Sequence, residues 1–205
     1  MTTVAVIDFE TTGLSPAAGD RATEIAIVLL EGDRVVDRYQ SLMNAGVRIS
    51  AFIEAYTGIS NAMIAAAPAA QRVMAEANRF VGKRPMVAHN ASFDRRFWVA
   101  ELQRLGQRAD QPFACTLLLS RRLWPEVRSY RLGSLASYHG LPDAGRAHRA
   151  MADAETAAAL WGRIRRDLHS RWGVAQAQHA LLMQLQACSH KALPRAIERH
   201  LGTVH

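Results

Sequence analysis

Two acidic residues stand one residue apart at the end of an apolar run near the start of the chain. The run VAVIDFETTGL carries them as Asp8 and Glu10. Side chains two residues apart on a strand point to the same face, so both carboxylates aim at one place. Like charges this close repel each other unless a cation lies between them, and oxygen-only ligands suit Mg²⁺ or Mn²⁺ rather than zinc. Taken alone, the pair is more typical of solvated acids at an exposed strand end.

Two later segments carry further groups that could do chemistry. MVAHNASFDRRF places His89 and Asn90 after a short strand and Asp94 in the first turn of a helix, where the helix dipole favours a carboxylate. AHRAMADAETAAAL places His148 in a glycine-containing loop and Asp153 at the start of a helix. A histidine beside a carboxylate-bound metal can serve as a general base near neutral pH. Each segment alone also has a sufficient structural interpretation, as a first-turn acid or an exposed loop histidine.

The elements that must position these groups follow from the periodicity of the apolar residues. Three strands predict an antiparallel meander, the first two joined by the turn-rich stretch TTGLSPAAGD and the last two by a hairpin at Gly32–Asp33. Helices and strands then alternate, which indicates an α/β domain with a mixed sheet. The predicted strands are 3–9, 22–30, 34–43, the segment PMVAHN and 113–116; the predicted helices are 51–57, one from Pro68 closed by Gly82, 93–105, and others near 117–124, 131–139 and 150–166.

The last part of the chain has a different pattern. Apolar residues at helical spacing from Val174 to Cys188, followed by a short helix from Pro194 to Gly202, predict a helical extension. We therefore divide the chain into a domain of residues 1–168 and a C-terminal helical extension of residues 169–205. The extension has two open interpretations: it packs on its own domain, or it docks a partner or a second copy of the chain.

Composition limits the class of protein. A chain of 205 residues with 49% hydrophobic residues suits one domain with a real core. Its apolar runs are broken by charge and no basic leader precedes a long apolar segment, so we expect no membrane segment and a cytoplasmic location. The formal net charge of +7 fits a polyanionic partner such as nucleic acid, and fits equally well arginines scattered over a solvated surface.

In chain order the three segments read VIDFETTGL, HNASFD and HRAMADA. Together they resemble the DEDDh exonucleases, the family that includes the proofreading subunit of bacterial DNA polymerase III and ribonuclease T, whose motifs read DxETTGL, HNxxFD and HxAxxDA. RSYRLGSLASYHGLP and TGIS resemble the turns between these motifs. The resemblance covers roughly residues 2–166. It departs at Thr57, where many members carry histidine, a position outside the catalytic set.

The resemblance implies a ribonuclease H-like fold, a five-stranded mixed sheet with helices on both sides, and two Mg²⁺ or Mn²⁺ ions held by four acids. Asp8 is expected to bridge both ions, and Glu10 and Asp153 to bind the ion that activates water. Asp94 is expected to act directly or through an intervening water. His148 is expected to remove the proton from the attacking water, next to the two metal ions.

The resemblance also implies a substrate. We expect hydrolysis of single-stranded 3′ ends of DNA to nucleoside monophosphates in proofreading or repair, with Glu10 near the 3′-hydroxyl and Phe93 stacking on a base. Leu14 is expected either to wedge between bases or to be buried. Two alternatives stay open: an exonuclease acting on RNA or short oligonucleotides, and a non-catalytic subunit associated with a polymerase. The predicted substrate contacts are Thr11, Thr12, Gly13, Leu14, His89, Asn90 and Phe93.

Overall fold

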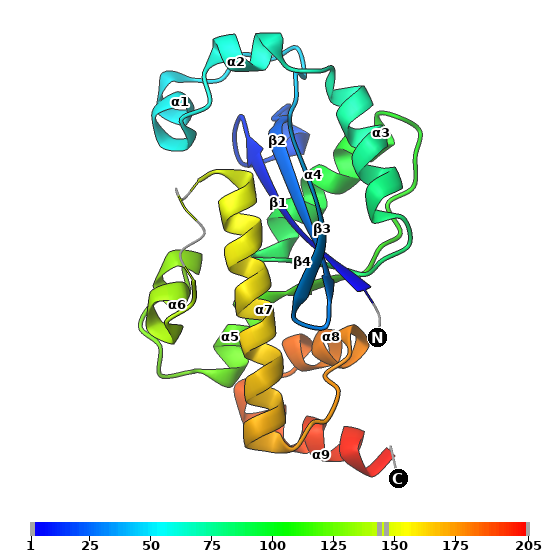
Figure 1. Cartoon of the computed structure of the whole chain (residues 1–205), viewed down its shortest axis with the longest axis vertical. Coiled ribbons are helices and arrows are strands. Elements are labelled where there is room, and N and C mark those ends of the chain that lie inside the picture. The colour runs from blue at the N-terminus through cyan, green and yellow to red at the C-terminus, as the bar shows by residue number, and fades with distance from the viewer. Residues whose placement is uncertain (1–2, 143–144, 146–147, 204–205) are drawn as a thin grey trace.

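A mixed sheet forms the centre of the molecule (Figure 1), seen in a computed structural model that describes residues 3–142, 145 and 148–203. In the described residues the sheet has five strands in the order β3-β2-β1-β4-β5. β1 pairs with β2 and β2 with β3 in antiparallel register, whereas β4 runs parallel to β1 and β5 parallel to β4. The predicted meander and mixed sheet are confirmed. The strands are β1 Thr3–Thr11, β2 Ala22–Glu31, β3 Arg34–Leu42, β4 Met86–Ala88 and β5 Phe113–Cys115.

Helices cover both faces of this sheet (Figure 1), as the ribonuclease H-like fold requires. α7 packs against β1 and β2, whereas α3 and α4 pack on the other side, against β2 and β3 and against β1, β4 and β5 respectively. The helices are α1 Ala51–Thr57, α2 Asn61–Ala66, α3 Ala70–Val81, α4 Ala91–Gln103, α5 Thr116–Leu123, α6 Leu132–His139, α7 Ala150–Trp172, α8 His179–Ala187 and α9 Leu193–Thr203, with 3₁₀ turns at Pro16–Ala18 and His190–Ala192.

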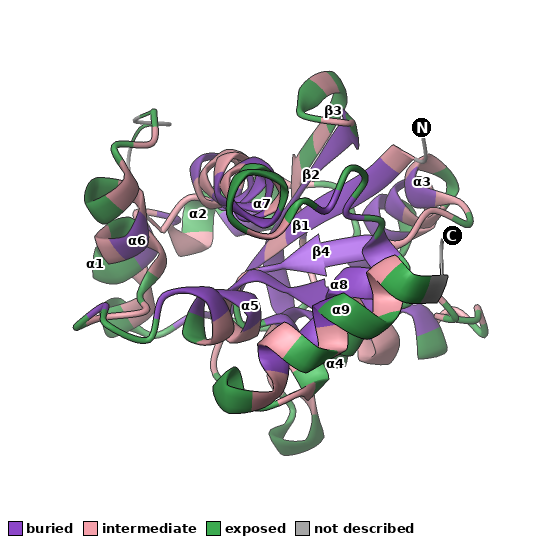
Figure 2. Cartoon of the chain, turned by 90° about the horizontal axis from the view of Figure 1, so that it is seen from below, coloured by how far each residue is buried: buried purple, intermediate pink, exposed green. Residues whose placement is uncertain are grey.

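The alternation of side chains along the strands divides the core into two layers. On β1, Val4 and Val6 join the cluster under α7, whereas Ala5 and Ile7 join the cluster under α3 and α4. Both sets are buried because helices cover both faces, which explains why the first part of β1 reads as a continuous apolar run. Figure 2 shows this buried sheet between the helices. Among the described residues, no helix combines the length and the apolar character needed to cross a membrane.

Some element boundaries differ from the prediction. The helix predicted from Pro68 begins at Ala70, and the helix predicted to end near 166 continues to Trp172. It ends where Gly173 adopts a left-handed backbone with φ of 68°, a conformation that glycine reaches without strain. The boundary predicted at residue 168 therefore falls inside α7.

The C-terminal helices belong to the same core as α7. Leu181, Leu182, Leu185 and Ile197 are buried in the cluster under α7. The Gln186 side chain also binds the outer edge of β5, because its Oε1 accepts the Cys115 N–H at 2.6 Å and its Nε2 donates to the Phe113 carbonyl at 3.3 Å. An amide side chain thus satisfies backbone groups that an edge strand would leave unpaired.

Candidate active site

The two acids of β1 extend the row of side chains that faces α7. Asp8 and Glu10 follow Val4 and Val6 at alternate positions, so they point to the face on which α7 begins. Glu10 is only 9% exposed. Two carboxylates therefore lie together at the end of a buried strand, as the spacing of the two residues predicts.

Two helices bring further acids to the same end of β1. Asp94, in the first turn of α4, is 2% exposed, and its Oδ1 accepts the Phe9 backbone N–H at 3.2 Å. Asp153, in the first turn of α7, accepts the His148 backbone N–H on Oδ2 at 2.9 Å. Helix termini from opposite faces of the sheet thus deliver one carboxylate each, where the helix dipole favours negative charge.

The electrostatics of these acids show that they act on one another. Burial, followed by the charges of Asp94, Asp153 and Glu10, raises the pKa of Asp8 well above its usual range. Burial and the neighbouring Asp153 carboxylate raise the pKa of Glu10 to about 8. Burial also raises the pKa of Asp94 to about 7, and that of Asp153. Four acids that resist ionisation beside one another form a site that a cation would stabilise.

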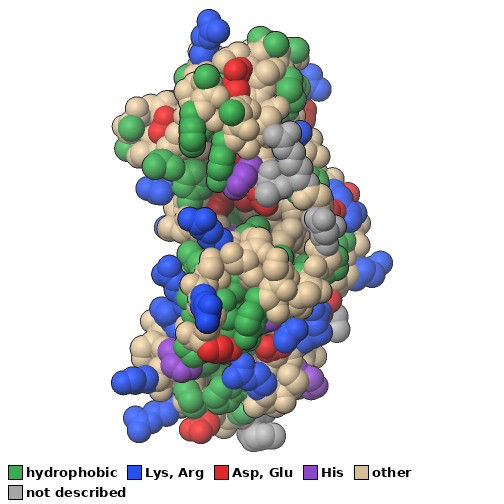
Figure 3. Space-filling view, turned by 90° about the vertical axis from the view of Figure 1, so that its left-hand side faces the viewer, with side chains coloured by type: hydrophobic (Ala, Val, Ile, Leu, Met, Phe, Trp, Pro, Cys, Tyr) green, Lys and Arg blue, Asp and Glu red, His purple; other side chains and the backbone are tan. Residues whose placement is uncertain are grey.

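His148 lies directly beside this acidic cluster. Ligand atoms of Glu10, His148 and Asp153 all lie within 4.8 Å of one another, close enough to share one metal ion. The imidazole stacks on Tyr56 of α1, with ring centroids 3.8 Å apart. Figure 3 shows a histidine and acidic side chains gathered in a recess, with hydrophobic side chains above them. In the loop predicted before His148, residues 143–144 and 146–147 lie outside the described residues.

The turn after β1 is held by hydrogen bonds within the turn itself. The Thr11 hydroxyl donates to the Gly13 carbonyl at 2.6 Å, and the Thr12 N–H donates to the Arg21 carbonyl at 2.9 Å. A Cβ at Gly13 would overlap the Asp20 carboxylate, so the turn needs glycine there. Leu14 is 77% exposed, so the buried alternative for Leu14 is wrong. An exposed leucine at this place is available for a substrate.

The residues predicted after β4 have differing surroundings. His89 is half-buried, and both of its ring nitrogens have partners: Nδ1 lies 2.9 Å from the Thr116 hydroxyl and Nε2 lies 3.0 Å from the Tyr130 carbonyl. Burial lowers its pKa to about 4, so the ring is neutral and donates from Nε2 to that carbonyl. Asn90 is exposed and has a left-handed backbone with φ of 65°. The half-buried Phe93 ring packs on Phe97, with centroids 5.0 Å apart.

Some residues that support this site were not predicted from the sequence. Glu24 is 1% exposed on β2 and pairs with Arg149, the residue after His148. The sequence does indicate Glu24, because ATEIAIVLL places one carboxylate inside a predicted strand that is otherwise apolar after its threonine. Tyr56 had no comparable signal, since its contact with His148 joins segments that are distant in the sequence.

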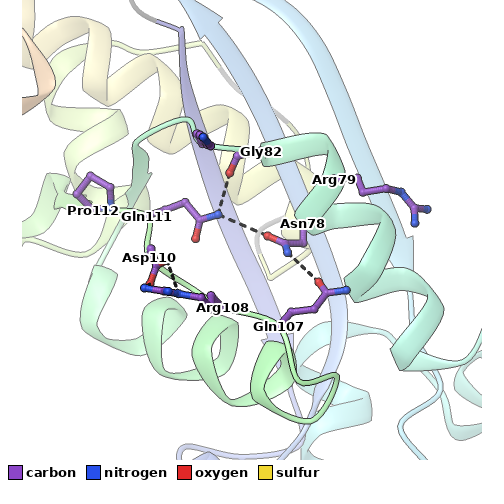
Figure 4. A pocket seen from close by; sticks show the side chains of 9 residues that line it. Asn78, Arg79, Gly82, Gln107, Arg108, Asp110, Gln111 and Pro112 are labelled. Atoms are coloured by element: carbon purple, nitrogen blue, oxygen red, sulfur yellow. Dashed lines mark hydrogen bonds and ion pairs between the residues drawn. The ribbon is translucent and has the colours of Figure 1, made fainter.

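A separate pocket of about 440 Å³ lies away from these acids, between the end of α3 and the loop before β5. In Figure 4 the Gln111 amide reaches both the Gly82 carbonyl, at 2.8 Å, and Asn78, while Asn78 also donates to Gln107 at 2.7 Å. The polar groups of this pocket bind one another, so the pocket has a structural explanation. None of the predicted site residues lines it.

The acidic cluster has the ligand chemistry of a divalent-metal site. Carboxylate oxygens prefer hard cations such as Mg²⁺ and Mn²⁺. Burial raises the pKa values of Asp8, Glu10 and Asp94, and neighbouring carboxylates raise those of Asp8 and Glu10 further. A bound cation would offset both effects, so the raised values fit this assignment. The residues of the site therefore fit the metal ions that the sequence predicts.

A sheet with helices on both faces, whose central strand ends in clustered acids, defines a ribonuclease H-like protein with an acidic site. The family model described as Exonuclease matches residues 5–161. The chain is 38% identical over 166 residues to the PolC-type DNA polymerase III of Oceanobacillus iheyensis, a match that covers 80% of this chain and 12% of that protein. The chain belongs to the exonuclease family.

Two further relatives match over most of their own length. The DNA polymerase III subunit epsilon of Aquifex aeolicus is 31% identical over 173 residues, which cover 84% of this chain and 85% of that protein. Exonuclease X, solved in complex with 5′ overhanging duplex DNA, is 31% identical with a TM-score of 0.66 and covers 82% of this chain and 93% of its own. The chain spans only about an eighth of the PolC-type relatives, so the activity and partners of those larger proteins do not transfer to it directly.

Proposed function

We propose that the protein is a metal-dependent 3′→5′ exonuclease that hydrolyses the terminal phosphodiester of a single strand and releases nucleoside monophosphates. The observation that carries this proposal is the meeting of Asp8, Glu10, Asp94 and Asp153 at one end of β1, with His148 beside them. Membership of the exonuclease family supports it.

In this proposal the four acids hold two Mg²⁺ or Mn²⁺ ions. When bound, such ions supply positive charge that stabilises the phosphate oxygens during displacement and lowers the pKa of the attacking water. Asp8 would be a ligand of both ions, because the charges of Asp94, Asp153 and Glu10 all act on its carboxylate. Glu10 and Asp153 lie on the side of His148, and Asp94 lies on the side of α4.

His148 is the general base of this proposal. Its imidazole accepts the proton of the attacking water, and its position is fixed at two points: the backbone N–H binds Asp153, and the ring stacks on Tyr56. A base must lie within hydrogen-bond reach of the proton that it removes. The short chain between His148 and the first turn of α7 keeps the base beside the acids.

The substrate of this proposal is a 3′ end of DNA. The turn of Thr11, Thr12 and Gly13 lies next to the acids, and the exposed Leu14 offers an apolar contact for the terminal bases. The half-buried Phe93 offers a further, aromatic contact. The DNA bound to Exonuclease X supports DNA over RNA, and the epsilon relative supports a polymerase as partner.

In this proposal the exposed surface of the tail is the docking place for that partner or for a second copy of the chain. Leu181, Leu185 and Ile197 are buried in the core of this chain, so docking through them would require the tail to leave its place. A polymerase would therefore bind the exposed faces of α8 and α9.

The proposal is tested by incubating the protein with 5′-labelled single-stranded DNA and RNA of the same sequence, each with Mg²⁺, Mn²⁺ or EDTA. A ladder that shortens from the 3′ end, and disappears with EDTA and in Asp153→Asn, is the expected result, with DNA cleaved faster than RNA. Faster cleavage of RNA would reverse the choice of sugar. A folded protein that cleaves neither strand with metal present would refute the exonuclease.

A further inference from the structure

A third acid lies on the sheet beside the pair on β1 and takes no part in the chemistry described above. Glu24 of β2 stands directly opposite Glu10 in the antiparallel register. The Glu24 side chain lies on the same face of β2 as those of Ala26, Val28 and Leu30, which pack beneath α7. With only 1% of its surface exposed, Glu24 is more deeply buried than Glu10.

Every acceptor position of the Glu24 carboxylate is used. Oε1 accepts from Gln40 Nε2 at 2.8 Å and from Arg149 Nη2 at 3.1 Å. Oε2 accepts from Arg149 Nε at 3.2 Å and from the backbone N–H of Ala150 at 3.2 Å. A carboxylate has about four acceptor sites, so this group is saturated. None of these sites remains for a ligand, so Glu24 acts by holding protein groups.

The protein groups that Glu24 holds are those that place the catalytic candidates. Arg149 directly follows His148, and Ala150 is the first residue of α7, the helix whose first turn carries Asp153. The Arg149 guanidinium and the Glu24 carboxylate form a bidentate pair, which fixes the orientation of the Arg149 side chain. The segment that bears both functional groups is thereby tied to the strand next to β1.

The backbone of His148 needs contacts of this kind to hold it in place. Its φ of 62° lies in the left-handed region, which is unfavourable for a residue with a side chain and persists where surrounding contacts enforce it. Asp153 binds the N–H of His148 on one side, and Glu24 binds the two residues that follow on the other. Two carboxylates thus hold the strained residue from both ends.

We propose that Glu24 is a positioning residue that fixes His148 and the first turn of α7 against the end of β1. The inference rests on the proposed function, because it assigns Glu24 to the placement of the general base and of one metal ligand. Displacements of about 1 Å lower the rate of an enzyme by up to about a hundredfold. Loss of the tie should therefore lower kcat and leave the KM for the strand nearly unchanged.

The test compares Glu24→Gln with Asp167→Asn. Asp167 is also a buried acid paired with an arginine, since it binds Arg163 Nε at 2.7 Å and Trp124 Nε1 at 2.8 Å, but it lies near the other end of α7. We expect Glu24→Gln to lower kcat by roughly tenfold to a hundredfold, and Asp167→Asn to lower the thermal midpoint without changing kcat. Equal effects of both variants on kcat would overturn the positioning role.

Two further measurements keep the test decisive. Amide hydrogen exchange at residues 148–150 should become faster in Glu24→Gln and not in Asp167→Asn, and unchanged exchange would refute the tie. A wild-type protein that cleaves no strand would refute the proposed function alone, because exchange still decides whether Glu24 holds this segment. If Glu24→Gln does not fold, Arg149→Lys, which keeps the charge and removes the fork, should lower kcat in the same direction; an unchanged kcat would contradict the proposal.

Discussion

Replacing Asp94 with asparagine should stabilise the metal-free protein, and the gain should grow with pH. Burial raises the pKa of Asp94 from its usual 3.8 to about 7. The folded protein therefore holds the proton more tightly than the unfolded chain does. The stability that the protonated Asp94 contributes is fully present below pH 3.8. It is lost as the pH rises toward 7, because ionisation favours the unfolded chain in that interval. Asparagine carries no charge and keeps the oxygen that accepts from Phe9.

The magnitude follows from the difference between the two pKa values. At about 1.4 kcal/mol per pKa unit, the difference between the folded and unfolded pKa values of Asp94 lowers the free energy of unfolding by about 4 kcal/mol at pH 8. At pH 5, where only the unfolded chain is ionised at this residue, the loss is about 1 to 2 kcal/mol. Asp94→Asn should recover most of this in EDTA. With Mn²⁺ the order should reverse, because the wild type binds metal through the carboxylate and gains stability by mass action.

The assay is urea unfolding at pH 5, 6, 7 and 8, in EDTA and in Mn²⁺, of the wild type, Asp94→Asn and the control Asp110→Asn. Asp110 lies in an exposed ion pair with 67% of its side chain accessible, so its variant should follow the wild type at each pH. A stability gain of Asp94→Asn that is absent at pH 8, or equal at pH 5 and pH 8, would refute the electrostatic reasoning.

Three other perturbations test separate parts of the structure. Burial lowers the pKa of His89 from 6.5 to about 4, so the free energy of unfolding should fall by about 3 kcal/mol as the pH drops from 6.5 to 4. In urea titrations His89→Asn should lose this pH dependence. The same pH dependence in the variant and in the wild type would contradict the assignment. Leu14→Ala should change the free energy of unfolding by less than about 0.5 kcal/mol and raise the KM for DNA roughly fivefold, from about 1 kcal/mol of apolar contact; a KM equal to that of the wild type would remove Leu14 from the substrate site. Leu182→Ala should cost about 2–5 kcal/mol in chemical unfolding, because Leu182 is fully buried in the core under α7; a cost near zero would mean that the tail does not belong to that core.

The helices and strands that depend only on neighbouring residues could be predicted from the sequence. The alternation of β1 placed Asp8 and Glu10 on one face, and a glycine after residue 57 ended α1 where expected. Such signals are local, because strand period, helix period and turn chemistry act within a few residues. The order of the three motifs then indicated the family and the four acids.

Contacts between distant segments were decided only by the tertiary structure. Asp94 and Phe9 are 85 positions apart, and Glu24 and Ala150 are 126 apart. The same holds for the Tyr56 ring on His148 and for Gln186 on the edge of β5. No periodic pattern records which segments meet, because that depends on how the whole core packs. The sequence therefore determined which residues could do the chemistry, and the packing of the sheet between its helices determined which residues hold them in place.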